Sequence, residues 1–90
     1  MSLRILGGNF RGRLLKSPQT KLTRPTLAVL RKAVFDILHN QIKDALFLDL
    51  FAGSGAMGIE ALSRDASHVT FVDNNPIAIR CLKENIHLLQ

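Results

Sequence analysis

The sequence has few of the features that mark secreted or membrane proteins. It holds one cysteine, Cys81, so no disulfide can form within the chain. No run of about 18 apolar residues suggests a membrane span. The basic start MSLRILGGNFRGR also has no apolar segment of the kind that a secretory signal needs. We therefore expect a cytoplasmic protein with no membrane as partner.

Acidic residues are absent from the first third of the chain. Residues 1–35 contain eight bases and no acid, whereas residues 36–90 contain four bases and seven acids. Such a basic segment attracts polyanions, and the alternative is a solvated basic arm. Because arginines and Phe10 lie among glycines in GGNFRGR, we favour RNA, which both kinds of side chain can contact. The residues assigned to RNA contact are Arg4, Arg11, Arg13, Lys16 and Arg24.

The first half of the chain is predicted to form an arm and a helix. RILGGNFRGRLLK, residues 4–16, has apolar patches split by glycines and suits two short strands joined by a turn. SPQTKLTRP, residues 17–25, is rich in turn residues, so residues 1–24 form a basic arm and linker. A helix is expected from about Pro25, capped by Thr23 or Thr26, to His39 or Asn40. Its expected buried face is Leu27, Leu30, Val34, Ile37 and Leu38.

The second half reads as strand, glycine loop, helix, strand and helix. The strands are expected at residues 45–51 and 68–73, with a short helix to about Arg64 between them. The last helix is expected from Pro76, capped by Asn74 or Asn75, with Ile79, Leu82, Ile86 and Leu89 on one face. This order predicts an α/β fold with parallel strands covered on both faces, the first part of a doubly wound domain. Residues 25–90 are thus expected to be an incomplete domain.

The stretch DLFAGSGAMG contains Gly53, Gly55 and Gly58 in the G-x-G-x-x-G spacing that is typical of dinucleotide sites. Asp49 stands four residues before the first glycine. With the carboxylate and a phosphate charge about 6 Å apart and an effective dielectric constant near 20, their repulsion is roughly 3 kcal/mol. S-adenosylmethionine has no phosphate, and its sulfonium and ammonium groups are cations. Electrostatics therefore favour the methyl donor.

Asp73 lies twenty residues after Gly53, at the end of the second expected strand. An acid at this place can accept hydrogen bonds from both ribose hydroxyls of a nucleoside. The alternative is a helix-capping turn in the sequence DNNP. The distance from the glycine loop favours ribose binding, although it does not separate the two cofactors.

The sequence resembles a known family over nearly its whole length. DLFAGSGAMGIEALSRDASHVTFVD is similar to the cofactor-binding segment of the bacterial small-subunit ribosomal RNA guanine-N2 methyltransferases. RILGGNFRGRLLK and TRPTLAVLRKAVFDIL resemble the arm and first helix of that family. The resemblance implies a Rossmann-like fold, S-adenosyl-L-methionine as cofactor, and ribosomal RNA or the small ribosomal subunit as partner. The cofactor-binding residues that the resemblance indicates are Asp49, Phe51, Gly53, Ser54, Gly55 and Asp73. We add their neighbours Ala52 and Asn74 to this predicted site.

No catalytic residue is assigned within the chain. The family's catalytic motif, Asp or Asn followed by Pro-Pro and an aromatic residue, is expected beyond Gln90, and NNPI at residues 74–77 is a helix start. The three histidines are too widely spaced for a metal site, so none is expected. Glu60 could reach the cofactor loop, but a structural role that caps and solvates its helix is favoured. Phe51 and Ala52 can be core residues, and Cys81 is expected in the core. Two alternatives stay open, a non-catalytic RNA-binding module and a fragment of a dinucleotide-dependent oxidoreductase.

Overall fold

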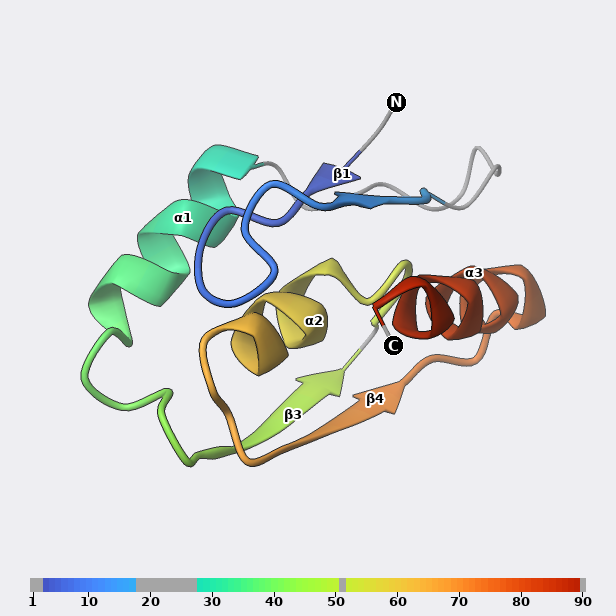
Figure 1. Ribbon diagram of the computed structural model, residues 1–90. Coiled ribbons are helices and arrows are strands. Elements are labelled where there is room, and N and C mark those ends of the chain that lie inside the picture. Colours follow the sequence, from blue (N-terminus) through green and yellow to red (C-terminus); the bar gives the residue numbers. More distant parts are fainter. Residues whose placement is uncertain (1–2, 18–27, 51, 90) are drawn as a thin grey trace.

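The computed structural model describes residues 3–17, 28–50 and 52–89. Their elements in chain order are β1 (Leu3–Arg4), β2 (Leu14–Leu15), α1 (Ala28–Ile37), β3 (Leu46–Leu50), α2 (Ala56–Ser63), β4 (His68–Val72) and α3 (Pro76–Leu88) (Figure 1). β1 and β2 pair antiparallel, and β3 and β4 pair parallel. The predicted α/β fold is confirmed, because β3, α2, β4 and α3 follow one another as at the start of a Rossmann-like domain.

The described segments stack in layers, with α2 in the middle (Figure 1). The β3–β4 pair lies on one side of α2, and the hairpin of the basic arm crosses its other side. One core cluster joins the arm to the glycine loop, α2 and α3; its buried members are Leu3, Ile5, Leu15, Ala52, Ala56, Ile59 and Leu82. The arm therefore packs on the same core as the loop that follows β3.

One face of the β3–β4 pair is open in the described part of the chain. Leu46, Leu48 and Leu50 are exposed, and Leu46 is 82% exposed. Phe71 of β4 points to the other face, where it approaches α2 at Gly58. The expectation of strands covered on both faces is therefore wrong for the described residues, because α2 packs on the Phe71 side of the sheet.

The buried face of α1 also differs from the prediction. Arg31 and Phe35 are buried, whereas Leu30 and Ile37 are 56% and 80% exposed. Phe35 stacks on Phe47 with ring centroids 6.0 Å apart. The predicted start at Pro25, its capping threonines and Leu27 lie outside the described residues. Of the other predicted residues, Val34 is half-buried and Leu38 packs on the cluster of Phe35, so apolar spacing found the face in part. It missed Arg31 because a charged residue does not enter an apolar pattern.

Glu60 explains why that charge is buried. Its side chain is fully buried, and its two oxygens accept the N–H groups of Leu6 and Gly7, both at 2.9 Å. Its ion pairs are with Arg31 Nε at 3.3 Å and Arg64 Nε at 2.9 Å. The role of Glu60 is structural, as favoured from the sequence, but its side chain is buried and does not solvate the helix. Its effect is to join the arm and α1 to α2.

Replacing Glu60 with Gln should remove the buried charge while nearly keeping the side-chain volume. Arg31 would then be a buried guanidinium without its counter-charge. We therefore expect the free energy of unfolding of the protein to fall by about 3–5 kcal/mol. Urea unfolding measures this loss. The matched control is Asp36→Asn, which breaks the exposed Lys32–Asp36 ion pair and should change stability little. Equal losses in the two variants would contradict the role given to Glu60.

Candidate functional site

The glycine loop between β3 and α2 needs its glycines for two different reasons. Gly53 and Gly55 have φ angles of 58° and 86°, in the left-handed region that favours glycine. Gly58 is within α2, and a Cβ on it would lie 2.3 Å from Cε1 of Phe71. The first two glycines thus shape the turn, and the third lets α2 pack closely on β4.

Asp49 caps the helix that begins at this loop. Gly55 is the N-cap residue of α2 and has no side chain to offer. The Oδ2 atom of the buried Asp49 instead accepts the N–H of Gly58, at 2.9 Å, in the first turn of α2. Free N–H groups in the first turn of a helix are those that bind phosphate. A carboxylate already lies against one of them, so a diphosphate would meet a negative charge there.

Burial raises the pKa of the Asp49 carboxyl above its ordinary value. The hydrogen bond from Gly58 acts in the opposite direction, and the nearby negative charge of Asp73 raises the pKa further. Asp73 is therefore close enough to Asp49 for its charge to act on the buried carboxyl.

Asp73 ties the end of β4 to the glycine loop. Its Oδ2 accepts the N–H of Gly53 and its Oδ1 the N–H of Asn75, both at 2.8 Å. Asn75 caps α3 by accepting the N–H of Ile77 at 2.9 Å, while Asn74 is exposed beside it. Of the two caps considered, Asn75 is the one used. Each Asp73 oxygen keeps a lone pair that can accept a further hydrogen bond.

The remaining residues predicted for the cofactor have mixed positions. Ala52 is buried in the core, as its structural alternative expects. Ser54 is buried, and its carbonyl accepts a hydrogen bond from Asn85 Nδ2 at 3.0 Å. Phe51 lies outside the described residues. The structure thus gathers Asp49, Gly53 and Asp73 around one loop.

The bases predicted to contact RNA lie on the surface of the arm. Arg4 donates to the carbonyl of Gly12 at 3.3 Å, and Arg13 to that of Leu88 at 2.6 Å. The exposed Lys16 pairs with Glu84 at 3.2 Å, and Arg11 is exposed as well. Arg24 lies outside the described residues. Arg31 of the same basic segment is buried against Glu60, so its charge is not available to a polyanion.

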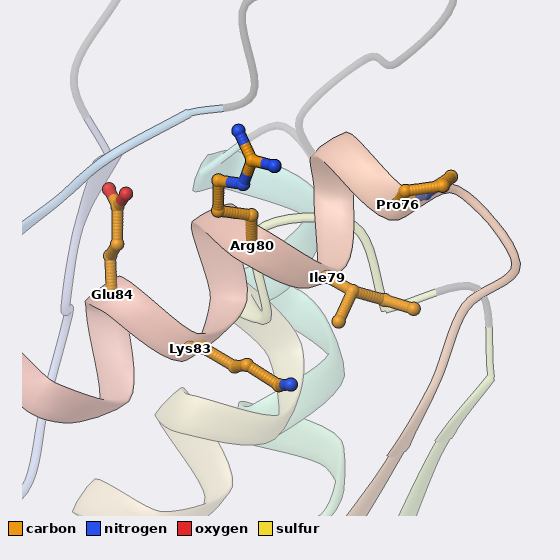
Figure 2. Close-up of a pocket in the computed structure, with 5 residues that line it drawn as sticks. All are labelled: Pro76, Ile79, Arg80, Lys83 and Glu84. Atoms are coloured by element: carbon orange, nitrogen blue, oxygen red, sulfur yellow. The ribbon is translucent and has the colours of Figure 1, made fainter.

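A groove along α3 contains two bases that the sequence did not single out. Its lining residues are Pro76, Ile79, Arg80, Lys83 and Glu84. Figure 2 shows Arg80 and Glu84 projecting to one side of the helix, and Ile79 and Lys83 to the other. The groove begins at Pro76, three residues after Asp73. In the sequence, Arg80 and Lys83 follow the Asp73 turn closely, and this spacing was the signal that could have pointed to the two bases of the groove.

Across residues 3–17, 28–50 and 52–89, no three His, Cys, Asp or Glu side chains gather as a metal site would require. No described helix is long and apolar enough to cross a membrane. Cys81 is buried and its Sγ donates to the carbonyl of Lys16 at 3.2 Å, while burial raises the pKa of the thiol. The predicted core role of Cys81 is confirmed.

The fold is similar to the corresponding half of solved structures, one of which is described as a methyltransferase. The structure of yhhF from Escherichia coli, described as a candidate methyltransferase, superposes with a TM-score of 0.89 at 38% identity, over 99% of this chain and 47% of that one. A hypothetical protein of Thermus thermophilus superposes with a TM-score of 0.81 at 46% identity, over 94% of this chain and 48% of that one.

The chain belongs to the family described as conserved hypothetical protein 95, whose model matches residues 3–90. Ribosomal RNA small subunit methyltransferase D of Escherichia coli is 42% identical over 88 residues, which are 98% of this chain and 44% of that protein. The enzyme of the same name from Haemophilus influenzae is 39% identical over 88 residues, 98% of this chain and 46% of that protein. The chain thus spans about half the length of these relatives, and its resemblance to a ribosomal RNA methyltransferase family is confirmed.

Replacing Asp49 with Asn should reveal the cost of the buried charge. Between the ordinary pKa and the raised pKa, the folded carboxyl holds its proton while the unfolded one has lost it. The contribution of this group to stability therefore falls as pH rises through that range. Asn can still accept the N–H of Gly58 and has no charge to bury. The stability of the variant relative to the wild type should therefore be greatest near pH 7 and decline as pH falls towards about 3.

Urea unfolding across that pH range measures the difference for Asp49→Asn. An advantage that grew as the solution became more acidic would contradict the raised pKa.

Proposed function

We propose that this chain is the RNA-binding arm and cofactor-binding half of an S-adenosylmethionine-dependent methyltransferase. Its substrate is the exocyclic N2 of a guanine in small-subunit ribosomal RNA. The names of the bacterial relatives support ribosomal RNA as substrate, and the resemblance of the arm and first helix supports the guanine position. The compartment that this implies is the cytoplasm.

The observation that carries the proposal is the hydrogen bond from Gly58 to Asp49. A dinucleotide loop offers the N-terminus of its helix to a diphosphate. In this loop a buried carboxylate lies against the first turn of α2, and Asp73 adds a second negative charge nearby. A ligand that is cationic near its reacting atom and has no phosphate suits this field, and S-adenosylmethionine is such a ligand.

The chain's own residues fit the rest of the cofactor. The left-handed Gly53 and Gly55 allow a ligand to approach the backbone closely, which supports binding at this turn. Asp73 is half-buried, bound to Gly53, and keeps lone pairs for ribose hydroxyls. Bound there, the cofactor supplies an electrophilic methyl group. These residues hold and orient it, and the groups that orient the guanine are expected beyond Gln90.

The open face of the β3–β4 pair supports the idea that this is one half of a domain. Leu46, Leu48 and Leu50 present three large apolar side chains on the face away from α2. Burying them would contribute roughly 1.5–3 kcal/mol each. Since the relatives are about twice as long, we propose that their remaining half covers this face and carries the catalytic motif. Residues 1–90 alone should then transfer no methyl group to ribosomal RNA.

Calorimetric titration tests the assignment of the loop. The intact protein should bind S-adenosylmethionine and S-adenosylhomocysteine, and bind NAD far more weakly, because the diphosphate of NAD would meet Asp49. Asp49→Asn should weaken binding of S-adenosylmethionine more than that of S-adenosylhomocysteine, since only the former carries the sulfonium charge. Tighter binding of NAD would favour the oxidoreductase instead. Binding of RNA but of neither S-adenosylmethionine nor S-adenosylhomocysteine would favour the non-catalytic module.

The bases of the arm make a second prediction, about salt. Replacing Arg11 and Arg13 with Ala should weaken RNA binding and flatten its dependence on salt, with the slope falling by about 0.7–0.9 for each phosphate that the arm no longer neutralises. Filter binding at several salt concentrations measures the slope. The control is Lys43→Ala, which removes an exposed base outside the arm. A slope that the double variant shares with the wild type would mean that the arm is solvated surface.

A further inference from the structure

Asn85 of α3 lies at a junction that the sequence did not indicate. Its side chain is fully buried. Its Oδ1 accepts the N–H of Lys16 at 2.7 Å, and its Nδ2 donates to the carbonyl of Lys16 at 2.9 Å. The same Nδ2 donates to the carbonyl of Ser54 at 3.0 Å. One amide therefore joins the end of β2 in the arm to the glycine loop.

The geometry uses the whole hydrogen-bonding capacity of that amide nitrogen. Its two N–H bonds have two acceptors, one on each of the segments that it joins. An aspartate at this place would set a carboxylate against two carbonyl oxygens. An apolar residue would remove both amide donors and leave the carbonyl of Lys16 with the thiol of Cys81 alone. Asn85 thus makes the position of Ser54 depend on the position of Lys16.

The arm also shares an apolar cluster with the glycine loop, but its side-chain hydrogen bonds to α2 do not reach that loop. Ser63 of α2 accepts the N–H of Phe10 at 2.9 Å and donates to the carbonyl of Gly7 at 2.6 Å. Glu60 binds the neighbouring backbone of the arm. Ser63 is the last residue of α2 and Glu60 lies in its middle, so neither is in the first turn, which starts at Ala56. They fix the arm without contacting the residues proposed for the cofactor.

We propose that Asn85 is a positioning residue that couples RNA binding on the arm to cofactor binding in the glycine loop. This inference rests on the proposed function. RNA held by Arg13 and Lys16 orders the end of β2, and the amide of Asn85 passes that order to the carbonyl of Ser54. The cofactor then binds to a loop that is already ordered, so the two ligands bind with positive cooperativity.

Binding experiments on the intact protein measure the coupling. The dissociation constant of S-adenosylhomocysteine is determined with and without a transcript of the small-subunit ribosomal RNA. Contacts between the arm and the phosphates of this transcript are enough for the test. In the wild type, RNA should tighten S-adenosylhomocysteine binding by about fivefold or more. By linkage, S-adenosylhomocysteine should tighten RNA binding by the same factor.

The variants separate coupling from stability. Asn85→Ala should bring the ratio of the two dissociation constants to one. The matched control is Ser63→Ala, which also removes hydrogen bonds between a helix and the arm backbone but should keep the wild-type ratio. A ratio of one in the wild type, or an unchanged ratio in Asn85→Ala, would overturn the inference. A wild type that binds no S-adenosylhomocysteine or no RNA would overturn the proposed function together with it.

Amide exchange in the wild type provides a test that needs no variant. S-adenosylhomocysteine alone should slow hydrogen exchange at the N–H of Lys16, which Asn85 accepts. The N–H of Phe10, which Ser63 accepts, should exchange at an unchanged rate. Nuclear magnetic resonance resolves the two amides. Equal slowing at both, or at neither, would show that Asn85 does not transmit cofactor binding.

Discussion

The buried carboxylate of Glu60 is the contact on which the arrangement of the other segments depends. A fully buried carboxylate is costly unless hydrogen bonds and counter-charges surround it. Glu60 obtains them from the backbone of the arm, from Arg31 of α1 and from Arg64 just after α2. Satisfying this one group therefore brings three segments together, and it sets the helix whose first turn forms part of the glycine loop.

Two further carboxylates give that loop its character. Asp49 comes from β3 and binds the first turn of α2, while Asp73 follows β4 and binds the backbone of Gly53. Both hold the loop in shape, and both make it negative. Under the proposed function, the contacts that stabilise the turn also disfavour a diphosphate and favour a cationic ligand. Asn85 then connects this loop to the arm.

Much of this arrangement was predictable because it depends on local order. Apolar runs and turn residues located β3, β4, α2 and α3, and spacing from the glycines located Asp49 and Asp73. The buried face of α1 and the junction at Asn85 were not predictable, because each depends on a polar side chain that meets a distant segment. Such pairs have no period in the sequence, and apolar spacing alone assigned Leu30 and Ile37 to the core when both are exposed.

The central claim is that the glycine loop holds the nucleoside of a methyl donor while Asp49 stays hydrogen-bonded to the first turn of α2. A crystal structure of the intact protein with S-adenosylhomocysteine tests it most directly. The account predicts ribose hydroxyls within hydrogen-bond distance of the Asp73 carboxylate, with Asp49 still accepting the N–H of Gly58. A nucleoside bound elsewhere, or an Asp49 side chain displaced from α2 by the ligand, would contradict it.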